Sequence, residues 1–127
     1  MLRDARLKFT RELSAQLVIR SVSETAIRVN DTEYNESIVL TPDDRLTMWS
    51  NKPIADLADA DFGLVIDSKP EIVLLGTGAT NVFPPRELTF AFARNGIGLE
   101  IMDTAAAART FNVLANEGRR VAAVLCL

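Results

Sequence analysis

A glycine-containing bend between two apolar segments is the first place where this chain could do chemistry. The stretch "EIVLLGTGATNVFPP", residues 71–85, places Gly76, Thr77 and Gly78 directly after an apolar run. Glycines at such a bend let backbone N–H groups converge on an anion. The third glycine of a dinucleotide fingerprint is missing, because Asn81 stands in its place, and the two prolines that follow supply no N–H. The pattern therefore disfavours a nucleotide site and favours a sharp turn that exposes the end of a strand, where ligands of α/β sheets usually bind.

Glu100 is the second candidate, because it lies inside the apolar run "GIGLEIM" at residues 96–102. A charged residue in a buried strand is costly unless it is paired or placed at a site. A carboxyl group among apolar walls would hold its proton more tightly and could act as a general base. The alternatives are an ion-pair partner and a residue at the edge of a sheet that faces water, and the sequence leaves all three open.

Four polar residues after Glu100 could complete a site. Thr104 and Asn112 would lie about 80° apart on one helix, although each could serve only to cap that helix or to hold a neighbouring loop. Arg119 could offer a fork to a carboxylate or phosphate, or pair locally with Glu117. The predicted cleft comprises Gly76, Thr77, Gly78, Glu100, Thr104, Asn112, Glu117 and Arg119.

Composition excludes several classes of chemistry. The chain has no histidine, which rules out Ser-His-Asp and Cys-His nucleophiles and histidine-based zinc sites. Its single cysteine, Cys126, cannot form an internal disulfide or a cysteine cluster, and it lies in a predicted buried strand as a small core residue. No cofactor or metal is expected. A net charge of -3 argues against nucleic acid as a partner.

The 127 residues are enough for one domain. Residues 1–16 are basic and are predicted to form a flexible arm, so that the single domain spans 17–127. No apolar stretch approaches the roughly 18 residues of a membrane span, and no secretory signal is present, which predicts a cytoplasmic protein. Self-association through Trp49 or the basic arm is left open.

The order of elements predicts a layered α/β domain. Strands and turns fill the first half, with a hairpin over 15–30 that suits a small antiparallel addition. Helices then alternate with strands, which favours crossover connections between parallel strands. The predicted elements are a turn at 30–34, strands at 36–44 and 45–50, a helix at 54–66, a strand at 71–75, a helix at 86–96, a strand at 97–102, a helix at 104–118 and a strand at 119–127.

From about residue 17 to residue 127, the chain resembles the respiratory complex I assembly factor 3 family. The resemblance rests on "PEIVLLGTG", on the proline-led helix and on "GIGLEIMDTAAAARTFNVLANEGRRVAAVL". The family usually has tyrosine where Phe111 stands, so the ring is kept without its hydroxyl. The most specific positions are Glu100, Met102, Thr104, Ala108, Thr110, Phe111, Asn112, Leu114, Glu117, Gly118 and Arg119.

The resemblance implies a three-layer α/β domain with a mixed central sheet and an additional N-terminal β layer. It implies no catalytic activity, and the mitochondrial relatives assist assembly of NADH:ubiquinone oxidoreductase through protein contacts. We therefore expect a non-enzymatic accessory protein whose partners are respiratory complex subunits or assembly factors. Two alternatives are a small-ligand or anion binder, and an enzyme in which Glu100 is the base and the loop amides hold an oxyanion.

Overall fold

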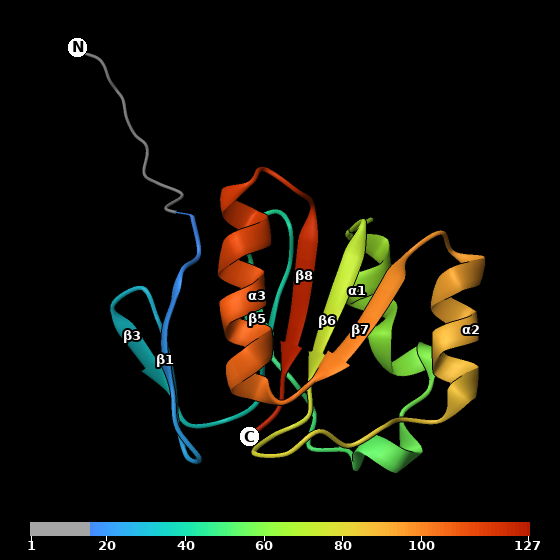
Figure 1. Ribbon diagram of the computed structural model, residues 1–127, viewed down its shortest axis with the longest axis horizontal. Helices are drawn as coiled ribbons and strands as arrows, with labels where there is room; N and C mark the ends of the chain where they lie inside the picture. Colours follow the sequence, from blue (N-terminus) through green and yellow to red (C-terminus); the bar gives the residue numbers. More distant parts are fainter. Residues whose placement is uncertain (1–15) are drawn as a thin grey trace.

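The computed structural model describes residues 16–127, so the predicted basic arm lies outside it except for Gln16. A five-stranded sheet with the strand order β5-β4-β8-β6-β7 forms the centre of the domain (Figure 1). β6 runs parallel to both β7 and β8, whereas β4 runs antiparallel to β5 and β8, so the sheet is mixed as predicted. These strands are β4 (Ile38–Leu40), β5 (Leu46–Met48), β6 (Ile72–Gly76), β7 (Gly98–Met102) and β8 (Val121–Leu125).

A second sheet has three antiparallel strands, β1 (Ile19–Val22), β2 (Ile27–Val29) and β3 (Thr32–Tyr34). The predicted hairpin is present as β1 and β2. The predicted turn over 30–34 is too long, because Asn30 adopts a φ of 52° and helps the chain to reverse within two residues. β3 then pairs with β2 along its whole length.

Two long helices follow the predicted boundaries closely. α2 (Arg86–Arg94) begins after Pro85, where the lack of an N–H costs nothing. α3 (Thr104–Asn116) is capped by Asp103, whose carboxylate accepts the Ala106 N–H at 2.8 Å.

The predicted helix over 54–66 is broken into three short pieces. These pieces are the 3₁₀ turns η1 (Ile54–Asp56) and η2 (Asp59–Phe62) and the short helix α1 (Gly63–Asp67). Ala58 has extended backbone angles, and its N–H donates to the Asp61 carboxylate at 2.9 Å. Aspartate competes for backbone donors in this way, which explains why apolar spacing alone did not produce a continuous helix.

The central sheet is covered on both faces, which gives the three layers that were expected (Figure 1). α3 and the small sheet pack on one face, and η1, η2, α1 and α2 pack on the other. β6 contributes to both cores, since Leu74 faces the first and Leu75 the second, and both are fully buried. The apolar run at 71–75 is therefore a strand covered on both sides, as its composition predicts.

Candidate functional site

The carboxyl end of β6 lies directly against the first turn of α3. A Cβ added to Gly76 would lie 2.9 Å from the Thr104 Cα and 3.2 Å from the Ala107 Cβ. Real Cβ atoms do not approach backbone atoms so closely, so only glycine permits this contact between strand and helix. The glycine that the sequence suggested for a ligand cradle therefore has a packing role.

The Thr104 hydroxyl joins three segments at this point. It donates to the Cys126 carbonyl at 2.6 Å and accepts the Gly78 N–H at 2.8 Å. The Thr104 N–H returns a hydrogen bond to the Gly78 carbonyl at 2.9 Å. Thr104 is buried, and its two side-chain bonds fix the glycine bend against α3 and the end of β8.

Thr77 closes the bend from within. Its N–H donates to the Met102 carbonyl at 2.9 Å, while its hydroxyl donates to the Thr80 carbonyl at 2.7 Å and accepts the Val82 N–H at 2.9 Å. The amides of Thr77, Gly78 and Val82 are thus all engaged inside the protein. An anion could reach none of these three donors without breaking a native hydrogen bond, so the bend is best described as a structural turn.

Glu100 lies in the middle of β7, directly opposite Leu74 of β6. In the part of the chain that the structure describes, β7 pairs only with β6 and forms an edge of the sheet. The Glu100 side chain is exposed there, which agrees with one of the three alternatives that the sequence left open, a residue at the edge of a sheet that faces water. A charge on an edge strand is a common protection against unwanted pairing with another strand.

The remaining predicted residues lie away from the bend. Asn112 holds β1 to α3, because its amide donates to the Ile19 carbonyl at 2.8 Å and accepts the Ile19 N–H at 3.0 Å. Glu117 is exposed at the carboxyl end of α3. Arg119 pairs with Glu71 at 3.4 Å, on the surface. The 13-residue α3 is about 20 Å long, which separates these residues from the bend at its other end.

A hollow of about 340 Å³ does open beside the bend, and Gly78 and Thr104 are the two predicted residues that line it. Burial raises the pKa of the Cys126 thiol to about 11, so at neutral pH this cysteine is a protonated thiol rather than a nucleophile. The other residues around the hollow are Val22, Ser23, Glu24, Ala79, Asp103, Ala105, Cys126 and Leu127.

Most of the residues that line this hollow could not be predicted from the sequence. Ser23 and Glu24 belong to the β1–β2 turn, and Leu127 follows β8, so these residues are far from Gly78 along the chain. Only the docking of the small sheet on α3 brings them together. The available signals were Gly78 in the glycine bend and Thr104, which follows the capping residue Asp103.

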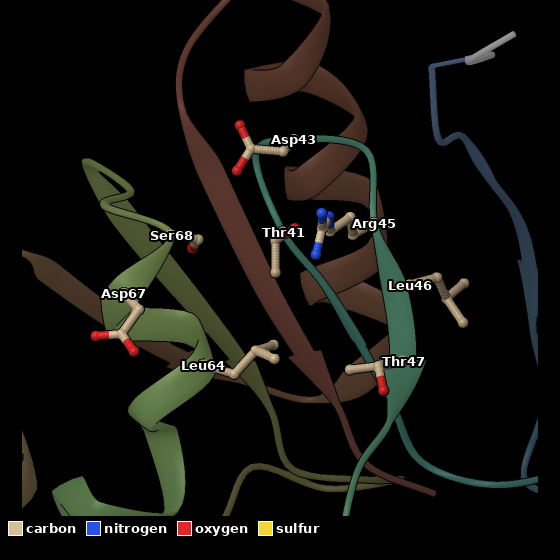
Figure 2. A pocket seen from close by; sticks show the side chains of 8 residues that line it. All are labelled: Thr41, Asp43, Arg45, Leu46, Thr47, Leu64, Asp67 and Ser68. Atoms are coloured by element: carbon tan, nitrogen blue, oxygen red, sulfur yellow. The ribbon is translucent and has the colours of Figure 1, made fainter. Parts of the chain in front are cut away.

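A larger hollow of about 600 Å³ lies between the β4–β5 turn and α1 (Figure 2). The figure shows Arg45 and Leu64 extending toward the space from opposite sides. Charges of both signs surround it, and Asp43 is also paired with Arg120 at 3.5 Å, so the rim does not select one sign of ligand. None of the predicted site residues lies here; the lining is Thr41, Asp43, Arg45, Leu46, Thr47, Leu64, Asp67 and Ser68.

Within residues 16–127, no cluster of three acidic, cysteine or histidine side chains that could hold a metal ion is found. The helices in this part of the chain are all too short or too polar to cross a bilayer.

Residues 19–126 match the family described as protein of unknown function (DUF498/DUF598). The chain belongs to this family. It is 31% identical over 118 residues to the Danio rerio protein named NADH dehydrogenase [ubiquinone] 1 alpha subcomplex assembly factor 3, covering 91% of this chain and 67% of that protein. This match confirms the family resemblance found in the sequence.

A bacterial relative carries a different name. The 13 kDa major membrane protein of Francisella tularensis is 30% identical over 98 residues, which cover 76% of this chain and 80% of that protein.

Solved structures share the fold of this family member. A Xanthomonas campestris protein studied by NMR has a TM-score of 0.80 and 36% identity, with 91% of this chain and 89% of that chain covered. A Bordetella pertussis protein described as an Mth938-like domain has a TM-score of 0.73 and 26% identity, with 93% and 90% covered. The three-layer α/β architecture is therefore common to these relatives.

Proposed function

We propose that this chain is a non-enzymatic accessory protein that supports assembly of a respiratory NADH dehydrogenase through protein contacts. The observation that carries the proposal is the match to assembly factor 3, which extends over 91% of this chain. A match of that length includes both sheets and all three α-helices rather than one local motif. The cytoplasmic location expected from the sequence is part of the proposal.

The chemistry of the glycine bend is consistent with this role. The loop amides that an oxyanion would need are bonded to Thr104, Met102 and the Thr77 hydroxyl. Glu100 is exposed and does not line the neighbouring hollow. The carboxylate-based enzyme considered from the sequence therefore lacks both of its components at this site.

Deletion of the gene in a source cell that has a multisubunit NADH dehydrogenase tests the proposal. We expect less of the fully assembled enzyme on native gels and lower NADH oxidation by isolated membranes, with both restored by a plasmid-borne copy. Succinate oxidation by the same membranes is the control and should not change. Normal amounts of assembled NADH dehydrogenase in the deletion strain would refute the assembly role.

A second candidate function is the binding of a small ligand in the hollow beside Gly78. The supporting observation is a 340 Å³ space whose wall combines the exposed Glu24 with partly apolar surface from Val22 and Leu127. A ligand that binds only the folded protein must raise the melting temperature. Screening of metabolites at millimolar concentration should give a shift that Ala105→Trp abolishes by filling the space, and no shift with any compound would remove this candidate.

A further inference from the structure

The outer face of α2 carries an aromatic side chain between two arginines. Arg86, Phe90 and Arg94 are spaced four residues apart, so they lie within about 80° of one another around the helix. All three are exposed, and Phe90 retains 54% of its accessible surface. The core-facing residues Leu88 and Phe92 occupy the opposite side of the helix. We call this row the Arg86–Phe90–Arg94 stripe.

A second aromatic residue, Phe83, lies just before the stripe and is 70% exposed. Arg86 follows it three positions later, so the two Cα atoms are at most about 11 Å apart. The segment that carries Phe83 is held firmly, because the Val82 N–H donates to the buried Thr77 and because Pro84 is buried. Phe83 is thus presented to solvent by an ordered loop.

Ordered, exposed aromatic residues are typical anchors of protein interfaces. An anchor that is already fixed loses little conformational entropy on binding, and aromatic and arginine side chains dominate interface hot spots. Among the ion pairs found within residues 16–127, none includes Arg86 or Arg94. Both guanidinium groups can therefore offer their paired N–H donors to carboxylates.

We propose that Phe83 and the Arg86–Phe90–Arg94 stripe form a docking surface for an acidic segment of a partner protein that also carries apolar side chains. The proposal rests on the proposed function, in which the chain acts through protein contacts, and names the surface and the chemistry of the partner. α2 stands at the end of the molecule farthest from the small sheet, so a partner can approach it from outside (Figure 1).

The charge of the whole chain favours a protein over a lipid bilayer as the partner. The chain has a net charge of -3, and an extended anionic membrane would be repelled by its other acidic surfaces. A compact acidic segment is affected mainly by nearby charges, because charges more than about 8 Å away are largely screened at physiological salt. On α2 these charges are the two arginines of the stripe and one exposed carboxylate, Glu87, so the helix keeps a positive balance.

Site-specific photo-crosslinking in cells tests this surface. The photoreactive amino acid p-benzoylphenylalanine is placed at Phe83, at Phe90 or, as a control, at Val113, which is 56% exposed on α3. We expect adducts from positions 83 and 90 but not from 113, joined to a sequenced peptide in which Asp or Glu alternates with apolar residues. No adduct at 83 or 90, or adducts to neutral or basic peptides, would overturn the proposal.

Charge reversal supplies the second measurement. Arg86→Glu with Arg94→Glu should lower the adduct yield from position 83 about tenfold or more, since like charges would then face each other. Arg109→Glu on α3, which is also exposed, is the matched control and should leave the yield unchanged. Melting temperatures close to wild type establish that each variant is folded, and an unchanged yield after the double reversal would overturn the proposal.

Two other occupants of this surface, a membrane and a second copy of this chain, would give different results in these experiments. Binding to phosphatidylglycerol vesicles that is lost in the double reversal would show a membrane surface instead, and adducts to a second copy of this chain would show a dimer; either result overturns the proposal. Full restoration of NADH dehydrogenase by the double-reversal variant would remove the surface but keep the assembly role. Normal assembly in the deletion strain together with charge-sensitive adducts would remove the assembly role but keep the docking surface.

Discussion

At Gly76 a missing side chain sets the distance between β6 and α3, and one hydroxyl then fixes the neighbouring loop. The Thr104 hydroxyl uses both its proton and a lone pair, on Cys126 and Gly78 respectively. Each of these backbone groups would be left without a partner if the hydroxyl were removed, which costs more than the loss of an exposed hydrogen bond. The sequence singled out Gly76, Gly78 and Thr104 as site residues, and the contacts that the structure gives them are those of close packing.

Gly76→Ala should destabilise the domain by about 1–3 kcal/mol, because the new methyl group would meet the backbone of Thr104. Urea unfolding at neutral pH measures the change. Gly63→Ala is the matched control, since a Cβ added there meets nothing within 4 Å, and it should be neutral or slightly stabilising. Equal stability of Gly76→Ala and wild type would show that β6 and α3 can separate at no cost.

At the scale of elements, polar side chains decide where the small sheet and the 3₁₀ turns lie. Asn112 binds both backbone groups of Ile19, and Asp61 binds the Ala58 N–H. Neither contact follows from the spacing of apolar residues alone. The first joins residues 93 positions apart, and the second interrupts a segment whose apolar residues recur at helical intervals.

Asn112→Ala should loosen β1 from α3 and lower the free energy of unfolding by about 1–3 kcal/mol, since two partly buried backbone groups lose their partner. Hydrogen exchange of the Ile19 amide should accelerate more than exchange of amides in β6. Asn116→Ala, one turn further along the same helix and exposed, is the control. Unchanged protection of Ile19 would mean that apolar packing alone holds β1.

Asp61 should make the stability of the domain sensitive to acid. The Ala58 N–H and then the Lys52 ammonium, at 2.9 Å, lower the pKa of Asp61. The resulting stabilisation is complete above the unfolded-state pKa of about 3.9 and is lost as pH falls through the lower pKa of the folded state.

Urea unfolding from about pH 6 down to pH 2 measures this effect, with the window set by the unfolded-state pKa. Below about pH 4 the wild type should lose stability more steeply than Asp61→Asn, whose side chain carries no charge to titrate. Asp59→Asn, in the same turn, is the control, because it leaves the hydrogen bonds of Asp61 to Ala58 and Lys52 in place. Parallel curves for the wild type and Asp61→Asn would contradict the predicted linkage.

For the molecule as a whole, the central sheet joins the two cores. Adjacent residues of β6 face opposite cores, so that damage to either core weakens the same strand. Trp49, the single tryptophan, packs against Phe62 in the second core with ring centroids 5.0 Å apart, and its fluorescence therefore reports on that side.

Leu74→Ala and Leu75→Ala should each lower the free energy of unfolding by about 2–5 kcal/mol, because both side chains are fully buried. In both variants the Trp49 fluorescence and far-UV circular dichroism transitions should coincide, as expected for a single two-state domain. Val113→Ala, at an exposed position, should have little effect. A Leu74→Ala protein in which Trp49 unfolds separately would show that the two cores are independent.

Local residue patterns were sufficient to predict most elements of this protein. Alternating and continuous apolar runs, the proline before α2, the Asp103 cap and the glycines after the helices depend only on neighbours in the chain, so the sequence alone determined the α/β class and the positions of α2, α3 and β6–β8. It also determined the absence of histidine chemistry. The family resemblance supplied the prediction of a three-layer domain.

The tertiary structure alone decided which residues meet. β8 pairs with β6 on the side opposite β7, and no other strand within residues 16–127 pairs with β7, so β7 is an edge strand and Glu100 faces water. Likewise, Gly78 and Thr104 share a hollow with the β1–β2 turn only because the small sheet docks on α3, through apolar packing and the Asn112 hydrogen bonds. The periodic spacing of apolar residues indicates which side of a segment is apolar, whereas strand order and long-range hydrogen bonds decide what that side faces.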